Sequence, residues 1–289
     1  MTKPNTRFQF KHGDNYHLER KKQGFHTEKI KNQPIRMNMN SLNKRLDVQK
    51  QFSTRASTFD QSARWITDEQ LIKAHPQELS RPGKGLELCC GTGAVGRAFV
   101  HLGWQMTGVD ITEAMVHETQ KYFPAIQHNV EEGLPFKDET FDAVVMRQAL
   151  FFFQPEKLLA EIQRVLKKGG RFVLSQTVPY ESPEDEAWLK KVHTTKQAQL
   201  LNFYTAKDLE DILQSAGFKI EKKRSLTVRE NITNWMHHAP ELSSEKKNEV
   251  MNLIRQTPKM LQPYRNVTEV NGVLEENWNW VIYTTTGKA

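Results

Sequence analysis

The segment that most constrains the fold of this 289-residue chain is GLELCCGTGAVG, from Gly85 to Gly96. Its residue order is typical of a short buried strand, a glycine turn and the start of a helix. Asp110, nineteen residues after Gly91, ends a second apolar stretch. Glycines let a ligand lie directly on the backbone, and a helix N-terminus presents free N–H groups to an anionic group. Because a carboxylate after the second strand can accept from both ribose hydroxyls, the segment predicts a nucleoside-bearing cofactor at the carboxyl edge of a parallel sheet.

The rest of the chain alternates between strand and helix patterns. This predicts a doubly wound, Rossmann-like α/β fold with a seven-stranded, mostly parallel sheet and helical lid insertions. Strands are expected at 85–88, 106–110, 125–130, 141–146, 171–175, 218–220 and 278–284. Residues 44–79 are expected to be helical, because apolar residues recur there on one face. Ser182 and Thr205 are expected to cap two later helices, the second with Asp208 in capping-box spacing.

Charge divides the chain into a tail and one domain. The net charge is +7, but residues 1–36 hold nine Lys/Arg and three Asp/Glu, so the remainder is nearly neutral. We expect a basic disordered tail over 1–40 and a single domain over 41–289, in which segments 44–65, 180–204 and 231–267 form a lid. The tail could alternatively be an arm for nucleic acid or an anionic membrane. A nucleic-acid substrate is not favoured, because the domain lacks a broad basic field.

Composition indicates a soluble, cytoplasmic protein. No apolar run approaches the ~18 residues that a membrane span needs. The two cysteines, Cys89 and Cys90, are adjacent on an expected buried strand and form neither a disulfide framework nor a zinc pattern. No metal site is expected, and the pattern leaves the oligomeric state open.

Two cofactor classes compete for the glycine turn, because Gly91, Gly93 and Gly96 also match the dinucleotide fingerprint. Glu87 discriminates between them. A carboxylate at the end of the first strand is unfavourable beside a pyrophosphate, which is itself negative. It suits a ligand with a cationic amine, and S-adenosylmethionine carries one together with a carboxylate and a ribose. The alternative is that Glu87 is a solvated acid at a strand end, although strand interiors disfavour unpaired carboxylates.

Several motifs in order resemble those of class I S-adenosylmethionine-dependent methyltransferases. LELCCGTG at 86–93 is similar to the first motif of that family, which is usually hydrophobic-Asp/Glu-x-Gly-Cys-Gly-Thr-Gly. LPF at 134–136, FDAVV at 141–145 and RVLKKGG at 164–170 resemble its later signatures. The likeness covers roughly residues 45–225 and is greatest to the ubiquinone/menaquinone-biosynthesis-type branch of small-molecule enzymes. DNA and RNA amino-methyltransferases usually have Asn/Asp-Pro-Pro-Tyr/Phe after the fourth strand, where this chain has MRQA.

The resemblance implies a cofactor site, with Glu87 near the amine, Asp110 on the ribose, and Ile111 and Met115 beside the adenine. The whole implied set is Glu87, Cys89, Gly91, Thr92, Gly93, Asp110, Ile111, Met115, Asn129, Val130, Glu131 and Arg147. Three positions depart from the family pattern. Cys89 replaces a usual glycine, Asn129 stands where aspartate is common, and Phe59 lies where related enzymes often have tyrosine.

The acceptor site is less defined by sequence. The lid segments are rich in aromatic residues, which favours a planar or lipophilic small molecule and C- or O-methylation. The alternative is a protein of this fold that acts on RNA or a protein partner through its basic tail. Tyr180, Gln148 and Phe152 are expected near the acceptor, although core packing is an equally good explanation for much of the run 151–153. A general base is needed only for some acceptors, and its candidates are His193, Tyr204, His237 and His238.

Overall fold

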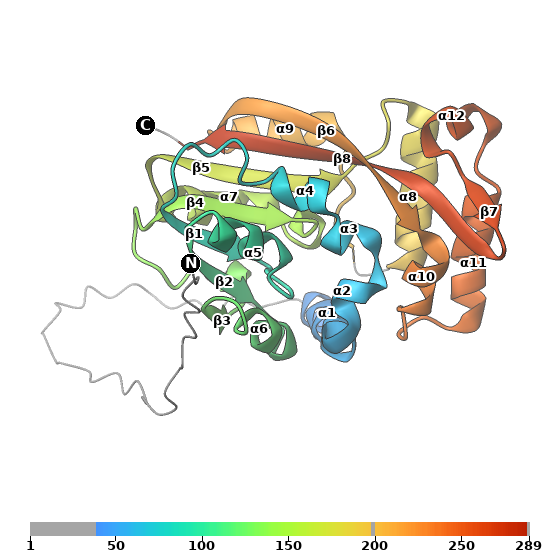
Figure 1. Cartoon of the computed structure of the whole chain (residues 1–289), viewed down its shortest axis with the longest axis horizontal. Coiled ribbons are helices and arrows are strands. Elements are labelled where there is room, and N and C mark those ends of the chain that lie inside the picture. The colour runs from blue at the N-terminus through green and yellow to red at the C-terminus, as the bar shows by residue number, and fades with distance from the viewer. Residues whose placement is uncertain (1–38, 198–199, 288–289) are drawn as a thin grey trace, which may run out of the picture. The chain divides into compact units, whose positions relative to one another are not determined.

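A computed structural model of the chain describes residues 39–197 and 200–287. The predicted tail therefore lies almost entirely outside the described residues. A central sheet has the strand order β3-β2-β1-β4-β5-β8-β6, and the short β7 pairs with β8 (Figure 1). The strands are β1 (Lys84–Leu88), β2 (Gln105–Asp110), β3 (Ala125–Gln127), β4 (Phe141–Arg147), β5 (Leu166–Thr177), β6 (Lys219–Asn231), β7 (Thr268–Val270) and β8 (Val273–Thr286).

The first five strands pair in parallel, and β8 runs antiparallel to both β5 and β6. This confirms the predicted fold class, with β7 as an additional strand. Parallel pairing places the carboxyl ends of β1, β2 and β4 at one edge of the sheet. In register, Glu87 lies beside Gly108 on one side and Val145 on the other.

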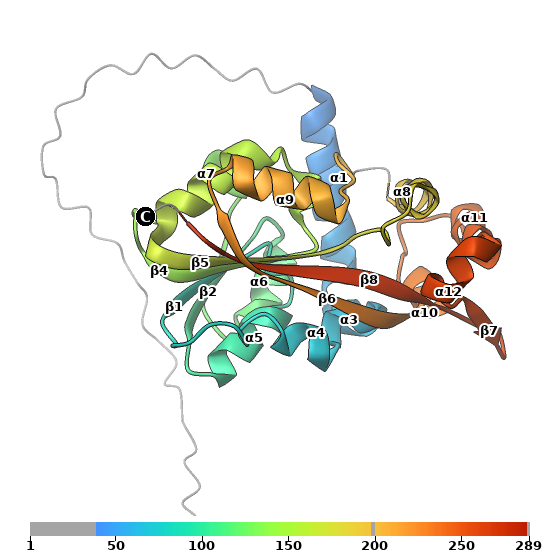
Figure 2. The same cartoon turned by 90° about the horizontal axis from the view of Figure 1, so that it is seen from above.

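Helices cover both faces of the sheet, with α7 and α9 on one face and α4 and α5 on the other (Figure 2). The helices include α5 (Ala94–His101), α6 (Glu113–Thr119), α7 (Pro155–Val165), α8 (Pro183–Lys196), α9 (Ala206–Ser215) and α11 (Ser244–Arg255). Both predicted caps are confirmed, since Ser182 accepts from the Asp185 N–H and Thr205 forms a capping box with Asp208.

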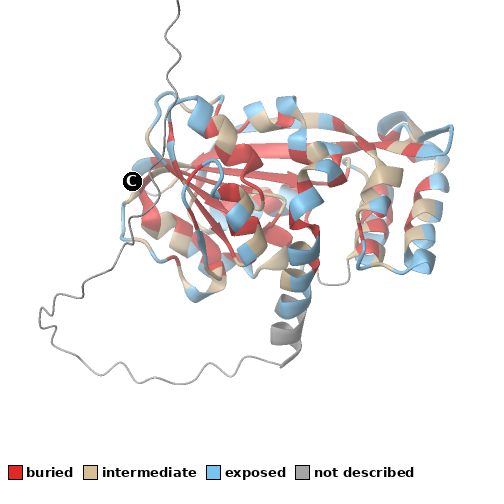
Figure 3. Cartoon of the chain, turned by 60° about the horizontal axis from the view of Figure 1, so that its bottom comes forward, coloured by how far each residue is buried: buried red, intermediate tan, exposed pale blue. Residues whose placement is uncertain are grey.

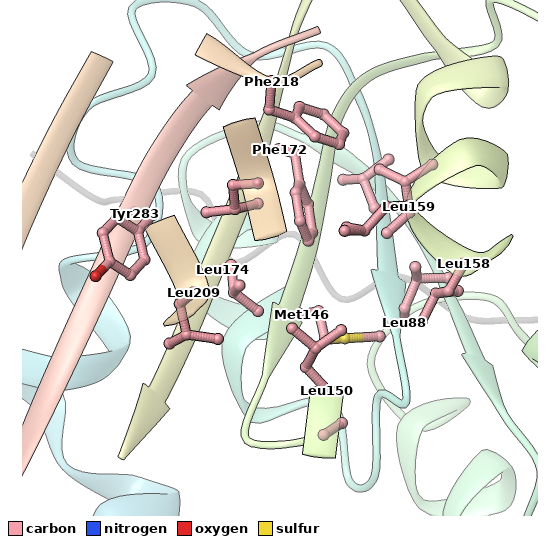
Figure 4. Packing of buried hydrophobic residues seen from close by; sticks show 14 of the residues in the cluster. Leu88, Met146, Leu150, Leu158, Leu159, Phe172, Leu174, Leu209, Phe218 and Tyr283 are labelled. Atoms are coloured by element: carbon pink, nitrogen blue, oxygen red, sulfur yellow. The ribbon is translucent and has the colours of Figure 1, made fainter. Parts of the chain in front are cut away.

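The core on the α7 and α9 face is continuous across three elements. Phe172 of β5 packs on Phe218, with ring centroids 5.3 Å apart. Leu158 and Leu159 of α7 belong to the same hydrophobic cluster (Figure 4). Tyr283 of β8 closes this core and donates to the Ala206 carbonyl at 3.0 Å. Buried residues are concentrated in the sheet, and exposed residues lie on the outer sides of the helices (Figure 3). No helix within the described residues is long and apolar enough to cross a membrane.

The segment expected to be helical over 44–79 is broken into short pieces. We call α1 to α4 the flap; its helices are α1 (Met39–Arg55), η1 (Ala56–Thr58), α2 (Phe59–Ser62), α3 (Arg64–Thr67) and α4 (Glu69–Lys73). The breaks after α2 and α3 occur at extended residues. Ala63 is extended, with φ −158° and ψ 144°, and Asp68 is extended while its side chain caps α4. These two residues separate α2 from α3 and α3 from α4.

The last two long strands extend well past the parallel part of the sheet. The sequence predicted only their sheet-bound portions, whereas β6 has 13 residues and β8 has 14. Their distal halves, with α8 and the segment from α10 to β7, form a lobe that we call the arm (Figures 1 and 2). The remaining elements of the chain are η2 (Val130–Glu132), η3 (Leu150–Phe152), α10 (Ile232–His237), η4 (Lys259–Leu261) and α12 (Gln262–Arg265).

Candidate active site

The glycine turn after β1 is bonded directly to the end of β2. The Gly91 N–H donates to Asp110 Oδ2 at 2.9 Å, and the Thr112 N–H donates to Asp110 Oδ1 at 2.9 Å. Gly91 and Gly93 have φ of 53° and 75°, in the left-handed region where glycine is favoured. Cys89 has φ 52°, which explains why the family usually places glycine there.

Glu87 is buried beneath this turn, with 5% of its surface exposed. Its Oε2 accepts from the Gly96 N–H at 2.9 Å, so the carboxylate faces the N-terminus of α5. A Cβ on Gly96 would lie 2.5 Å from that oxygen and 2.3 Å from Phe123, which explains the third glycine. Burial raises the pKa of Glu87 to about 7, against the opposing effect of Arg147. A cationic ligand beside Glu87 would relieve this cost of burial.

The Asp110 carboxylate is arranged as expected of a group that accepts hydrogen bonds from ribose hydroxyls. It is 8% exposed, and burial raises its pKa. Each of its oxygens accepts one backbone N–H, and a carboxylate oxygen has a second lone pair for a further donor. The two backbone bonds fix the plane of the carboxylate. The free lone pairs of the two oxygens can therefore accept from the two hydroxyls of a vicinal diol.

A cavity of about 470 Å³ extends from this edge of the sheet to the flap and arm. It is lined by all but one of the residues expected to hold the cofactor: Glu87, Cys89, Gly91, Thr92, Asp110, Ile111, Met115, Asn129, Val130, Glu131 and Arg147. The exception, Gly93, serves instead as the N-cap of α5. Asn129 lines the cavity while its Oδ1 accepts from the Glu131 N–H at 3.1 Å, which leaves one lone pair on that oxygen.

Two sets of polar contacts hold the flap over the glycine turn. Asp60 accepts from the Thr92 hydroxyl and from Arg97 Nη2, the latter at 2.8 Å. On the other side, Arg147 donates to the carbonyls of Trp65 and Ile66 at 3.0 and 3.2 Å. Arg147 thus lies at the cavity with its guanidinium bonded to the flap.

The predicted acceptor residues have different placements. Phe152 and Gln148 line the cavity. The Gln148 side-chain amide is already paired at both ends, because it donates to Thr177 Oγ1 at 2.6 Å and accepts from the Thr177 N–H at 2.8 Å. Its polar atoms therefore fix the turn after β4.

The expectation that Tyr180 faces the active-site edge is wrong. Beyond β5 the chain continues along β8, with the Val178 N–H on the Asn279 carbonyl, and the Tyr180 N–H donates to Asp185 at 2.7 Å. This path carries the Tyr180 ring into the arm, where it packs on Arg265 at 5.1 Å. Tyr180 does not line the cavity.

Of the four candidate bases, only His193 lines the cavity. Burial lowers its pKa to about 3, and its ring lies 6.2 Å from that of Trp278. Tyr204 is packed in the core between α7 and α9, and burial raises its pKa to about 12. The rings of His237 and His238 meet edge to face at the end of α10, and neither residue lines the cavity. The expectation is therefore corrected for those three, because their elements turn them away from the cavity.

Sequence reasoning missed two cations in the cavity wall, Arg55 and Lys196. Lys196 continues the inward face of α8 that begins with Leu189 and Val192, at spacings of three and four residues. The position of Lys196 at the end of this apolar helical stripe is the sequence pattern that could have predicted its burial. Arg55 lies at the end of α1, and no pattern in that polar helix distinguishes it from its neighbours.

Comparison with known proteins identifies the family of this chain. Residues 86–174 match the methyltransferase-domain family. The ubiquinone/menaquinone biosynthesis C-methyltransferase of Desulfotalea psychrophila is 30% identical over 212 residues, which cover 61% of this chain and 84% of that protein. The chain belongs to the class I S-adenosylmethionine-dependent methyltransferases. Its cofactor is S-adenosylmethionine, as the resemblance in sequence implied.

Solved structures share the fold of this methyltransferase at low identity. YcgJ from Bacillus subtilis has a TM-score of 0.63 at 18% identity, covering 76% of this chain and 97% of that one. Geranyl diphosphate C-methyltransferase from Streptomyces coelicolor has a TM-score of 0.52 at 12% identity, covering 76% and 79%. At these identities the likeness shows the fold alone.

Proposed function

We propose that this methyltransferase transfers a methyl group to a small aromatic or lipophilic metabolite, by C- or O-methylation. The observation that carries the proposal is one cavity with two contrasting walls. One wall is the polar carboxyl edge of the sheet. The other, which we call the acceptor chamber, is lined by the rings of Phe52, Phe59, Phe152, Trp235 and Trp278.

The cofactor half is proposed to bind through the residues of the carboxyl edge. Glu87 would face the amine, Asp110 the ribose hydroxyls, and Ile111 and Met115 the adenine. S-adenosylmethionine, when bound, supplies a sulfonium methyl that is already strongly electrophilic. The protein's own task is then to align an acceptor and to exclude water.

The acceptor chamber is suited to planar, apolar groups. The Phe52 ring lies edge-on to Phe59 at 5.9 Å and to Phe152 at 6.2 Å, and Trp235 is edge-on to Trp278 at 4.9 Å. Such rings bury large apolar area and select flat partners through edge and face contacts. Because Phe59 approaches the Gly91 backbone, it places this chamber next to the cofactor turn.

Carbon methylation is supported by the name of one similar protein, the ubiquinone/menaquinone biosynthesis C-methyltransferase of Desulfotalea psychrophila. A quinone ring is planar, and the aromatic walls of the acceptor chamber suit a planar ring. Oxygen methylation remains compatible with it, since a phenol fits the same aromatic walls.

A methyl-transfer assay tests the proposal. The protein is incubated with S-adenosylmethionine labelled in the methyl group and with three separate pools: low-molecular-weight metabolites, total RNA and total protein. We expect label in an organic-extractable metabolite, and none above background with the Asp110→Ala variant. Label confined to RNA or protein would support the alternative of a macromolecular acceptor, and no label in the metabolite pool would contradict the proposal.

A further inference from the structure

Arg55 is a buried cation in the wall of the acceptor chamber. Its side chain is 9% exposed, and its guanidinium lies 4.9 Å from the centre of the Phe52 ring and 5.6 Å from that of Phe59. Its Nε has no hydrogen-bond partner among the described residues. A buried N–H group without a partner is energetically costly, so Arg55 Nε remains able to donate a hydrogen bond to a ligand atom.

Lys196 is a second buried cation in the same wall, contributed by α8. Its side chain is 4% exposed, and its Nζ lies 4.9 Å from the centre of the Trp235 ring. Helix α8 and the flap are more than a hundred residues apart in sequence. Two elements that are distant in sequence therefore each place one cationic side chain in the wall of the same apolar chamber.

One acid, Glu241, lies near both cations and does not satisfy either fully. Its Oε1 is 3.6 Å from Arg55 Nη1 and 3.7 Å from Lys196 Nζ. The same oxygen accepts a much shorter bond, 2.7 Å, from the amide of Gln51. Glu241 is itself 20% exposed at its side chain, and Lys247 on α11 acts on Lys196 from outside the cavity lining. When Lys196 is protonated, the two buried cations exceed the one acid by one positive charge.

We propose that the methyl acceptor carries a carboxylate, which Arg55 and Lys196 bind together. This inference rests on the proposed function and specifies its substrate class as an aromatic or lipophilic carboxylic acid. The guanidinium presents paired donors that match a carboxylate, and the ammonium supplies a compact point charge. A carboxylate is favoured over a phosphate monoester because one negative charge balances the surplus, whereas two would exceed it.

Bound anion would also change the protonation of Lys196. The pKa of Lys196 is lowered to about 7, first by burial and then by the charge of Arg55, while Glu241 acts in the opposite direction. The groups facing it are Arg55 from α1, Glu241, and Lys247 from α11. A carboxylate beside the ammonium favours the charged form. Binding at pH 8 should therefore take up a proton, whereas binding at pH 6, where the lysine is already charged, should take up almost none.

The test compares 2-naphthoate with its neutral counterpart 2-naphthalenemethanol, by calorimetry on the full chain loaded with S-adenosylhomocysteine. Naphthyl phosphate is the third probe. We expect 2-naphthoate to bind roughly 10- to 100-fold more tightly than the alcohol, as for a charge-assisted contact, and more tightly than the phosphate. Proton uptake is measured in buffers of different ionisation enthalpy at pH 6 and pH 8.

Three variants make the result specific. Lys196→Gln and Arg55→Met should each reduce the preference for the acid at least several-fold, and Lys196→Gln should also abolish proton uptake at pH 8. Lys191→Met, an exposed lysine on the same helix, is the matched control and should behave as wild type. Equal affinity for acid and alcohol, tighter phosphate binding, or no measurable binding of the acid by the wild type would overturn the inference. If S-adenosylhomocysteine itself failed to bind, the proposed function would fail instead, so the two failures are distinguishable.

Discussion

The cofactor half of the cavity is built from one continuous stretch of chain, whereas the acceptor half is assembled from distant segments. The turn, Asp110 and Asn129 all lie within the βαβ series between β1 and β4. The acceptor chamber takes side chains from the flap, from η3 and from the arm, which includes α8. The first half depends on backbone geometry at strand ends. The second depends on how three insertions pack, and small sequence changes in them can alter the acceptor without altering the cofactor.

The largest expected effect is a loss of cofactor affinity when the proposed ribose contact in the cofactor half is removed. Asp110→Ala removes a carboxylate proposed to accept from both hydroxyls, and it also frees the Gly91 N–H. We expect S-adenosylhomocysteine affinity to fall roughly 100-fold, as for the loss of hydrogen bonds to a charged group. Calorimetry measures this. Asp138→Ala, whose side chain is 76% exposed, is the matched control, and unchanged affinity in Asp110→Ala would remove Asp110 from the site.

A smaller effect is expected where the flap meets the cofactor turn. Asp60→Asn weakens the contacts to Thr92 and Arg97 that join the two halves. Their partial exposure limits the loss, and we expect kcat/KM for methyl transfer to fall about tenfold while cofactor affinity changes less. Glu69→Gln, in an exposed pair with Lys73, is the control. An equal loss of cofactor affinity would mean that the flap belongs to the cofactor half.

Cofactor affinity should depend on pH through Glu87. Its pKa is raised to about 7 without ligand, and a cationic amine beside it favours the ionised form. Affinity for S-adenosylhomocysteine should therefore rise several-fold from pH 5.5 to pH 7, with release of a proton on binding at the lower pH. Glu87→Gln should flatten this dependence. A wild-type affinity that does not change over this range would place the amine elsewhere.

The smallest expected effect concerns Tyr204. Its hydroxyl is buried without a hydrogen-bond partner among the described residues, and it lies in the core rather than in the cavity. Tyr204→Phe should leave methyl transfer unchanged and shift the free energy of unfolding by no more than about 1 kcal/mol, in the stabilising direction. Denaturant unfolding and the transfer assay measure the two quantities. A large loss of transfer would return Tyr204 to the candidate bases.

The cofactor half could be predicted from sequence because each of its features has a local cause. Gly91 and Gly93 are required by positive φ, Gly96 by its approach to Glu87, and Asp110 by the end of a strand. Parallel pairing then brings them to one edge of the sheet. The capping box at Thr205 could also be predicted from sequence, because Thr205 and its partner Asp208 are three residues apart.

The acceptor half could not be predicted in the same way. The break of the flap at Ala63 depends on tertiary contacts, including the Arg64 and Trp65 N–H groups on the buried Glu230 of β6. Tyr180 was misplaced because the pairing of β5 with β8 continues beyond the expected end of the strand. Lys196 ends an apolar stripe of α8, but only the fold brings Arg55, from a distant helix, into the same cavity wall.

The most direct test of this division is a crystal structure of the full chain with S-adenosylhomocysteine. The account predicts that the ribose hydroxyls bind the Asp110 carboxylate, that the amine faces Glu87, and that the sulfur opens toward the chamber between Phe59 and Phe152. An adenosine group placed among Phe52, Trp235 and Trp278, with Asp110 free of the ribose, would contradict it.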